Sequence, residues 1–308
     1  MMFNPFVTLG ADVQHRFRRR AQACGVVMLG IALAGCGRSA PPADVRTLLQ
    51  SSDGAGTISC PARGGFTPES GYHSQFYEDY VLGYVFKNVA QGVYVDVGAH
   101  RPDVNSVTKH FYERGWRGIN IEPIPELIEL FRRQRSNDVN LGIGISDIVG
   151  ELTFYQSEQM VISTFDPDVM KRHKAKGVRF DEVRVPVSTL NAVFEQQPII
   201  RSGVTFLNAD VEGFEKQVFS GLDFTKYQPQ VIMAEATAPN TEIPTHQAWE
   251  SILITAGYVF AMDDGLNRYY VHRTRQDLLP RFLEVNYCVG LDKVAKHIKL
   301  DGFRKVGS

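Results

Sequence analysis

The stretch Val93-Tyr94-Val95-Asp96-Val97-Gly98-Ala99-His100 predicts the turn on which the fold is built. Its β-formers indicate a buried parallel strand, and the helical pattern that follows indicates a strand–turn–helix unit. Gly98 would let the backbone come close to a ligand, and Ala99 would keep that approach clear. Asp96 would lie at the carboxyl end of the strand, where open α/β sheets bind ligands. An ordinary βα turn without a ligand explains the stretch equally well.

The composition limits the class of protein. With 308 residues, of which 44% are hydrophobic and 22% charged, the chain is long enough for one large domain or two small ones. A formal net charge of −1 gives no basic field, so nucleic acid is not an expected partner. None of the four cysteines are paired at the spacing of a structural zinc site, and a disulfide between Cys60 and Cys288 stays open.

Residues 1–36 resemble the signal segment of a bacterial lipoprotein. Arginines at positions 16 and 18–20 precede an apolar run from Cys24 to Ala34 that is too short to span a bilayer comfortably. The ending Leu33-Ala34-Gly35-Cys36 resembles a lipobox, which implies cleavage before Cys36 and acylation of its sulfur. An uncleaved anchor and a mis-assigned start codon are the alternatives. We therefore expect membrane attachment through the N-terminus, with export favoured over a cytoplasmic face.

The rest of the chain divides into a tether over 37–73, a folded domain over 74–283 and a basic tail over 284–308. Within the domain strand and helix patterns alternate, which predicts a doubly wound, mostly parallel α/β sheet. Strands are expected at 93–97, 118–122, 139–145, 204–210 and 231–234, added strands at 151–155 and 181–187, and a C-terminal antiparallel pair at 258–262 and 268–271. Helices are expected at 75–88, 104–113, 125–134, 189–195 and 248–255, and another ends near 219.

Acidic residues follow the first three strands at one edge of this sheet: Asp96, Glu122 and Asp147. An acid roughly 20 residues after a glycine turn is typical of a ribose site, because a carboxylate accepts hydrogen bonds from both hydroxyls. Later glycines of a dinucleotide turn are replaced by Ala99 and Pro102, so a pyrophosphate would lack its cradle. The pattern favours a nucleoside without phosphates, and S-adenosylmethionine is the obvious candidate.

Several separated motifs resemble the FkbM-type methyltransferases. They are Asp96 to His100, Gly115-Trp116-Arg117-Gly118-Ile119-Asn120-Ile121-Glu122-Pro123, and Asp210-Val211-Glu212-Gly213-Phe214-Glu215. Ser74-Gln75 with Glu78-Asp79 matches that family's opening, and 264–270 matches its last strands. The resemblance implies a Rossmann-like class I fold and S-adenosylmethionine as cofactor, most commonly for O-methylation of sugar or polyketide hydroxyls. Asn208 departs from the pattern, because that family usually has a lysine there.

The resemblance also implies roles for particular residues. Asp96, Gly98 and Ala99 would line the methionine end of the cofactor, Glu122 would hold the ribose, and Ser146 with Asp147 would face the adenine. Asp210 and Glu212 would lie where the methyl group meets its acceptor, with the alternative that Asp210 caps the next helix. Glu235 and His246 are assigned to substrate binding. The alternatives are an arginine pair for Glu235 and an ordinary loop position for His246.

A hydroxyl is a poor nucleophile until a base takes its proton, and a carboxylate at ~3 Å can do this. A divalent metal on the same acids is the weaker reading, since only two or three ligands are visible, so no metal site is expected. Substrate contacts are expected from the insert 156–181 and the loop 240–246. The sequence does not indicate an oligomeric state.

Three hypotheses result. The leading one is an S-adenosylmethionine-dependent O-methyltransferase that acts on a sugar, a glycan or another small molecule. The second is a non-catalytic, membrane-tethered lipoprotein in which a degenerate methyltransferase fold binds a glycan or an envelope partner. The third, a nicotinamide oxidoreductase, is disfavoured by the missing glycines.

Overall fold

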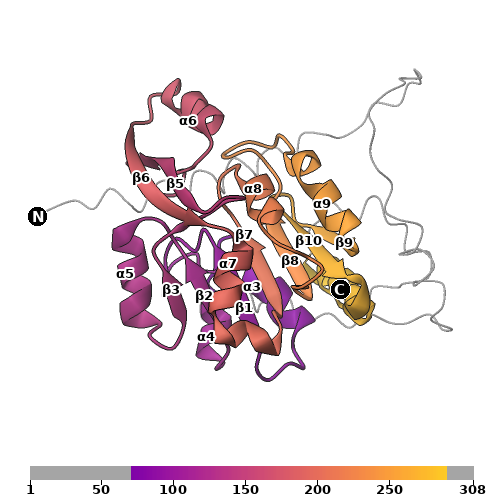
Figure 1. Cartoon of the computed structure of the whole chain (residues 1–308). Coiled ribbons are helices and arrows are strands. Elements are labelled where there is room, and N and C mark those ends of the chain that lie inside the picture. Colours follow the sequence, from indigo (N-terminus) through magenta and orange to yellow (C-terminus); the bar gives the residue numbers. More distant parts are fainter. Residues whose placement is uncertain (1–70, 290–308) are drawn as a thin grey trace, which may run out of the picture. The chain divides into compact units, whose positions relative to one another are not determined.

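The computed structural model describes residues 71–289, and Figure 1 shows their arrangement. The predicted signal segment with Cys36, most of the tether and the end of the basic tail lie outside these residues. Residues 71–73, expected in the tether, pack on the domain instead: the Tyr72 ring stacks on His110, with ring centroids 4.6 Å apart. Within 71–289 no helix is long and apolar enough to cross a membrane.

A seven-stranded sheet forms the centre of the domain, in the order β3-β2-β1-β7-β8-β10-β9. Five strands run parallel to one another: β1 (Val93–Val97), β2 (Arg117–Ile121), β3 (Val139–Leu141), β7 (Phe206–Ala209) and β8 (Val231–Glu235). The last pair, β9 (Tyr258–Asp263) and β10 (Asn267–His272), is antiparallel, and β10 also runs antiparallel to β8. The expected doubly wound, mostly parallel sheet with a C-terminal antiparallel pair is confirmed.

Alternation along β1 sends its side chains to two buried faces, as in other parallel strands covered on both sides. Val93, Val95 and Val97 pack on the face covered by α7 (Leu190–Gln196), α8 (Glu215–Ser220) and α9 (Glu250–Thr255). On the other face, α3 (Glu78–Val85), α4 (Lys109–Glu113) and α10 (Leu279–Val289) pack over Tyr94. Asp96 alternates with the valines, so it lies on the same side of the strand as Tyr94.

Aromatic side chains hold the second face together around Phe206. Its ring lies beside those of Phe86, Tyr94, Phe111 and Trp116, with centroids between 4.8 and 6.3 Å apart. All five side chains are fully buried. Burying a large apolar side chain contributes about 1.5–3 kcal/mol, so this cluster fixes the sheet against its helices.

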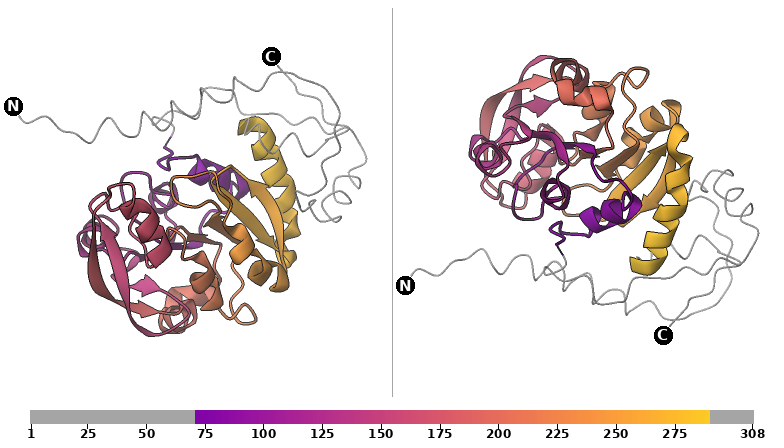
Figure 2. Two further views of the ribbon diagram at one scale, coloured as in Figure 1. Left: turned by 90° about the horizontal axis from the view of Figure 1, so that it is seen from above. Right: turned by 90° about the horizontal axis from the view of Figure 1, so that it is seen from below.

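Helix α10 packs along α3, as Figure 2 shows. The hydroxyl of Tyr84 donates to Glu284 at 3.0 Å, and Arg281 donates to the carbonyl of Val85 at 2.6 Å. Phe282 and Val285 are buried in the same contact. The fold therefore continues past the domain end expected at residue 283.

A second sheet has the order β4-β6-β5 and consists of β4 (Gly144–Ile145), β6 (Phe180–Ser188) and β5 (Gly150–Ser157). The single strand expected over 139–145 therefore divides: β3 stays in the main sheet and β4 joins the small one. Glycine is needed at position 144, where the chain enters β4, because a Cβ there would lie 2.4 Å from the ring of Phe165.

Helix α6 (Pro167–Lys174) joins β5 to β6, within an insert for which the sequence analysis proposed no helix. Asp166 caps it by accepting from the N–H groups of Asp168 and Val169 at 2.6 and 3.2 Å, and Pro167 occupies its first turn.

α5 (Pro125–Gln134) matches its expected bounds. The remaining turns are η3 (Pro198–Ser202), η4 (His246–Ala248) and η5 (Arg273–Leu278). α4 begins at Lys109, so residues 104–108 form a loop rather than the expected helix.

Candidate active site

A pocket opens at the carboxyl ends of β1, β2 and β7, and part of it is open to solvent. Its lining carries five carboxylates and, within the described part of the chain, neither lysine nor arginine. The five are Glu78, Asp96, Glu122, Asp210 and Glu212. Such a lining favours a cationic ligand over a phosphate.

Asp96 lies in the pocket, and each of its carboxylate oxygens accepts one side-chain hydrogen bond. Asn208, its register partner on β7, donates to Oδ1 at 2.9 Å, and Thr108 donates to Oδ2 at 2.9 Å. Burial raises the pKa of Asp96, while these two donors partly oppose that rise. Asn208 stands where the resemblance expects a lysine. A neutral amide therefore binds Asp96 and adds no positive charge to the pocket.

Gly98 is required by a contact between two strand exits. Its φ is +80°, and a Cβ there would lie 1.8 Å from the carbonyl oxygen of Asp210. The Asp210 N–H donates to the carbonyl of Val97 at 3.0 Å, which fixes this approach. From the sequence, Gly98 was expected to let the backbone come close to a ligand. The structure gives a backbone neighbour as the reason, although Gly98 and Ala99 do line the pocket.

Glu122 is held in the pocket by two backbone donors. Ile124 donates to Oε1 and His100 to Oε2, each at 2.9 Å. The side chain is 5% exposed, and burial raises its pKa to about 7 against the lowering effect of those donors. Each carboxylate oxygen has a second lone pair, so Glu122 can still accept hydrogen bonds from a ligand hydroxyl.

The structure does not bring Ser146 and Asp147 into the pocket lining. Ser146 is buried and donates to Asp147 at 3.0 Å, while Asp147 is exposed. The residues just before them, 143–145, do line the pocket and are apolar or glycine. This follows from the turn of β4 into the second sheet, which carries Ser146 away from the edge where β1 and β2 end.

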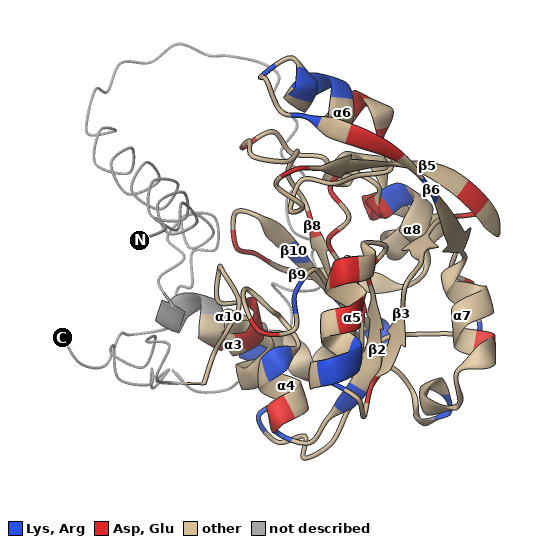
Figure 3. Ribbon diagram, turned by 90° about the vertical axis from the view of Figure 1, so that its left-hand side faces the viewer, with Lys and Arg blue, Asp and Glu red and all other residues tan. Residues whose placement is uncertain are grey.

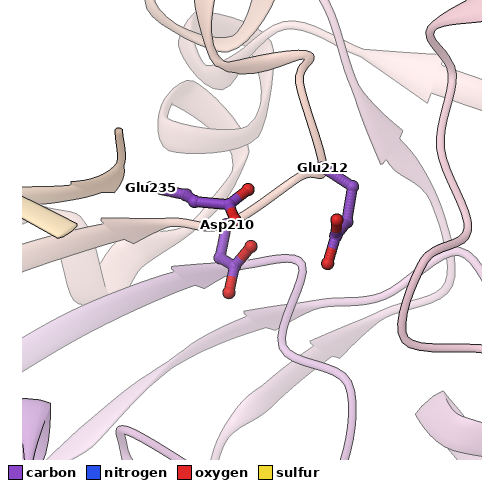
Figure 4. A group of neighbouring side chains, drawn as sticks. All are labelled: Asp210, Glu212 and Glu235. Atoms are coloured by element: carbon purple, nitrogen blue, oxygen red, sulfur yellow. The ribbon is translucent and has the colours of Figure 1, made fainter. Parts of the chain in front are cut away.

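Asp210 and Glu212 meet a third acid, Glu235, at the exits of β7 and β8. One carboxylate oxygen from each lies within 4.8 Å of the others, as Figure 4 shows. Burial and the neighbouring Asp96 raise the pKa of Asp210 to about 6. Burial, then repulsion by Asp210 and Glu215, raises the pKa of Glu212 well above its usual range. Burial, followed by repulsion from Glu212, also raises the pKa of Glu235 well above its usual range.

The alternatives for two of these acids do not hold in the structure. α8 begins at Glu215 without any side-chain cap, so Asp210 is not its capping residue. Glu235 is 5% exposed and forms no ion pair with an arginine among residues 71–289. Neither carboxylate therefore has the partner that its alternative required; Asp210 lines the pocket, whereas Glu235 lies beside Asp210 outside the lining.

The loop that carries Glu212 is clamped from both sides. Glu215 accepts from the N–H groups of Val211 and Gly213, each at 3.2 Å. Thr164, from the insert between β5 and α6, donates to the carbonyl of Glu212 at 2.9 Å. Glu212 itself has a φ of +54°, a conformation that costs a non-glycine residue about 1–3 kcal/mol and clusters at functional sites.

Residues 96–260, more than half of the chain, match the family model described as the methyltransferase FkbM domain. The chain belongs to the FkbM methyltransferase family. No curated protein matches the sequence. The family resemblance seen in the sequence is thereby confirmed, and with it a Rossmann-like methyltransferase fold. The matched FkbM region runs from Asp96 on β1 to Phe260 on β9 and contains all three clustered acids.

The insert of this FkbM domain contributes to the pocket, whereas the loop 240–246 does not. Met160, Val161, Ser163 and Phe165 of the insert are in the lining. His246 begins η4, is half-buried and is not among the lining residues. Basic side chains gather on α6 instead, where Lys171, Arg172 and Lys174 form its last turn (Figure 3).

Arg135 is a positioning residue of the FkbM domain that the sequence analysis missed. Its guanidinium is 2% exposed and donates to Thr108 at 2.6 Å, to the carbonyl of Pro102 at 2.6 Å and to Ser106 at 2.7 Å. It therefore holds the loop after β1 and, through Thr108, orients Asp96. In the sequence it follows Arg132 and Arg133, so it looks like part of a solvated basic run.

Arg135→Met is expected to lower the free energy of unfolding by about 3 kcal/mol, because it leaves buried acceptors without a donor. Urea titration of both proteins measures this change. Arg133→Met is the matched control, since Arg133 is 70% exposed and pairs only with Glu129; it should change stability by less than about 0.5 kcal/mol. Equal stability of the two variants would show that the buried guanidinium does not hold the loop.

Proposed function

We propose that this FkbM domain transfers a methyl group from S-adenosylmethionine to a hydroxyl of a sugar, a glycan or another small molecule. The observation that carries the proposal is the pocket lining, with its five carboxylates and no lysine or arginine in the described residues. S-adenosylmethionine has a sulfonium and an ammonium group, both cations that such a lining favours. A dinucleotide brings a pyrophosphate, which the same lining repels.

The residues present fit the cofactor part by part. Both oxygens of Glu122 have lone pairs for the two ribose hydroxyls, and Asp96 gives the methionine end a negative neighbour. Ile124, Ile143 and Ile145 form an apolar part of the lining, which suits an adenine ring better than the exposed Asp147 does. When bound, S-adenosylmethionine would supply an electrophilic methyl group on its sulfonium.

The acids at the exits of β7 and β8 have the acceptor role. Asp210 and Glu212 line the pocket beside Gly98 and therefore face the methionine end of the cofactor. Their carboxylates can bind the acceptor hydroxyl, orient its oxygen and take its proton, a contribution worth typically ~10²–10⁴-fold in rate. Apolar insert residues such as Phe165 also line the pocket and would limit the access of water to a bound acceptor.

Calorimetry on the full chain tests the cofactor. Titrations with S-adenosylmethionine, its demethylated product and NAD are expected to give heat with the two sulfur compounds and none with the dinucleotide. A second assay follows label from methyl-labelled S-adenosylmethionine into a panel of free sugars and glycans. Absence of binding by both sulfur compounds contradicts the proposal. Binding without transfer to any hydroxyl compound would favour the non-catalytic alternative.

Membrane attachment through Cys36 remains a second, separate proposal, supported by the arginine cluster, the apolar run and the lipobox-like ending. In a bacterial host the parent chain should incorporate labelled fatty acid and lose its first 35 residues, whereas Cys36→Ala should stay unlabelled and unprocessed. One acyl chain binds membranes only weakly, so firm attachment would indicate more than one. A parent chain that is unlabelled and full length contradicts the signal interpretation.

A further inference from the structure

We propose that Asp210, Glu212 and Glu235 bind a divalent cation, such as Mg²⁺ or Mn²⁺, at the acceptor end of the pocket. The catalytic role of this ion rests on the proposed function, whereas its binding does not. No metal was expected from the sequence, because only two or three candidate ligands were visible there. The structure places the Glu235 carboxylate in one group with the other two.

The spacing of the three carboxylates fits one ion. One oxygen from each lies within 4.8 Å of the others. Oxygen ligands bind Mg²⁺ at about 2.1 Å and Ca²⁺ at about 2.3–2.6 Å, so two ligands of one ion are separated by no more than about 4–5 Å. The three side chains therefore reach a common centre with only small adjustments. Carboxylate oxygen is also the ligand type that these hard cations prefer.

A second observation indicates a missing cationic partner. Glu235 is 5% exposed, and its Oε2 has no hydrogen-bond partner among the described residues. The same holds for Oε2 of Glu212. In Figure 4 the side chains of Glu235 and Glu212 extend toward that of Asp210. A buried carboxylate without a donor costs several kcal/mol, and a bound cation removes that cost.

The surrounding side chains offer no other counter-charge. Within residues 71–289 no lysine or arginine forms an ion pair with any of the three, and none lines the pocket. Asn208, the neutral neighbour on β7, donates its amide N–H to Asp96. Three clustered carboxylates repel one another when ionised, and either protonation or a cation from solution relieves that repulsion.

The three ligands are also held by rigid parts of the fold. Asp210 is fixed to Val97 through its backbone, Glu212 lies in the loop clamped by Glu215, and Glu235 ends β8. Three protein ligands leave room in a six-coordinate shell for water and an acceptor hydroxyl. A hydroxyl bound to the ion would lose its proton more readily, which is the usual role of such an ion in catalysis.

Titration of Mn²⁺ into the EDTA-treated full chain tests the site directly. One Mn²⁺ per chain is expected, and Glu235→Gln and Glu212→Gln should each weaken binding at least tenfold. Glu182→Gln on β6 is the matched control, because Glu182 is exposed and is not among the residues that line the pocket, and this variant should bind Mn²⁺ like the parent. No Mn²⁺ binding by the parent, or equal affinity in all variants, overturns the proposal.

Thermal unfolding of the parent and of Glu235→Gln distinguishes loss of the ion site from failure to fold. Without the ion, Glu235→Gln should melt no lower than the parent, because the substitution removes a buried negative charge. Mn²⁺ should raise the melting temperature of the parent and leave that of the variant unchanged. If Mn²⁺ stabilises the parent and the variant equally, Glu235 is not a ligand and the site is not the one proposed.

Calorimetry with S-adenosylmethionine in EDTA separates this proposal from the proposed function. We expect unchanged cofactor binding, loss of methyl transfer, and recovery of transfer on addition of Mg²⁺ or Mn²⁺. Cofactor binding and transfer without any Mn²⁺ binding would overturn the cation site and leave the function standing. Mn²⁺ binding without cofactor binding would overturn the function and leave the cation site standing.

Discussion

Glu122→Gln is expected to weaken S-adenosylmethionine binding about 100-fold. The carboxylate would accept two charge-assisted hydrogen bonds from the ribose, and replacing charge by a neutral amide costs about 1.4 kcal/mol for each. Glutamine is the better test than alanine, because its one carbonyl oxygen still accepts from one of the two buried N–H groups, those of His100 and Ile124, that Glu122 binds. An alanine would leave both donors unsatisfied and would destabilise the loop as well.

The raised pKa of Glu122 also predicts how the affinity for S-adenosylmethionine depends on pH. Burial raises the pKa of Glu122 to about 7, and hydroxyl donors favour its ionised form. Cofactor affinity of the parent should therefore rise with pH and be about tenfold lower at pH 6 than at pH 8. For folding alone the sign is opposite: the raised pKa stabilises the free protein below pH 4.5, and that stability is lost as the pH rises through 7.

Calorimetry at pH 6, 7 and 8 measures both effects of Glu122→Gln. The variant should bind more weakly at pH 8 and lose the part of the pH dependence that the parent owes to Glu122. Glu129→Gln on α5 serves as control, since Glu129 pairs only with exposed arginines and should leave affinity unchanged at every pH. A Glu122→Gln variant that binds as tightly as the parent contradicts the ribose assignment.

The sheet and the edge that carries the pocket were predictable because their signals are local. Each core strand is a short run of β-formers, and the acids Asp96 and Glu122 directly follow or end such runs. Glu122 was found by its spacing from Gly98, and its side chain does line the pocket. Even the missed helix α6 had a local signal, since Asp166-Pro167 is a typical helix start.

What the sequence did not reveal depends on contacts between distant segments. The strand expected over 139–145 divides because Phe165 packs on Gly144, and this same division moves Ser146 out of the pocket lining. Glu235 joins Asp210 because β7 and β8 pair with Ala209 opposite Ala234, a register that the sequence does not specify. Arg135 is buried only because the loop after β1 folds over it.

Asp210→Asn is expected to lower methyl transfer by ~10²-fold or more, while the affinity for S-adenosylmethionine changes by less than about threefold. Asparagine has nearly the same shape as aspartate but carries no charge and cannot take a proton from a hydroxyl. It is also a much weaker ligand for a divalent cation. The fold should be retained, because the contact of Asp210 with Val97 uses the backbone and α8 starts without its side chain.

Single-turnover transfer to a hydroxyl acceptor, together with calorimetry of the cofactor, separates these effects. Asp168→Asn on α6 is the matched control: its side chain is 73% exposed and pairs only with Lys171, so transfer should equal that of the parent. A loss confined to cofactor affinity would move Asp210 from the acceptor to the cofactor side of the pocket. If transfer by Asp210→Asn equals that of the parent, neither a base nor a cation at Asp210 takes part in the reaction, because both need its charge.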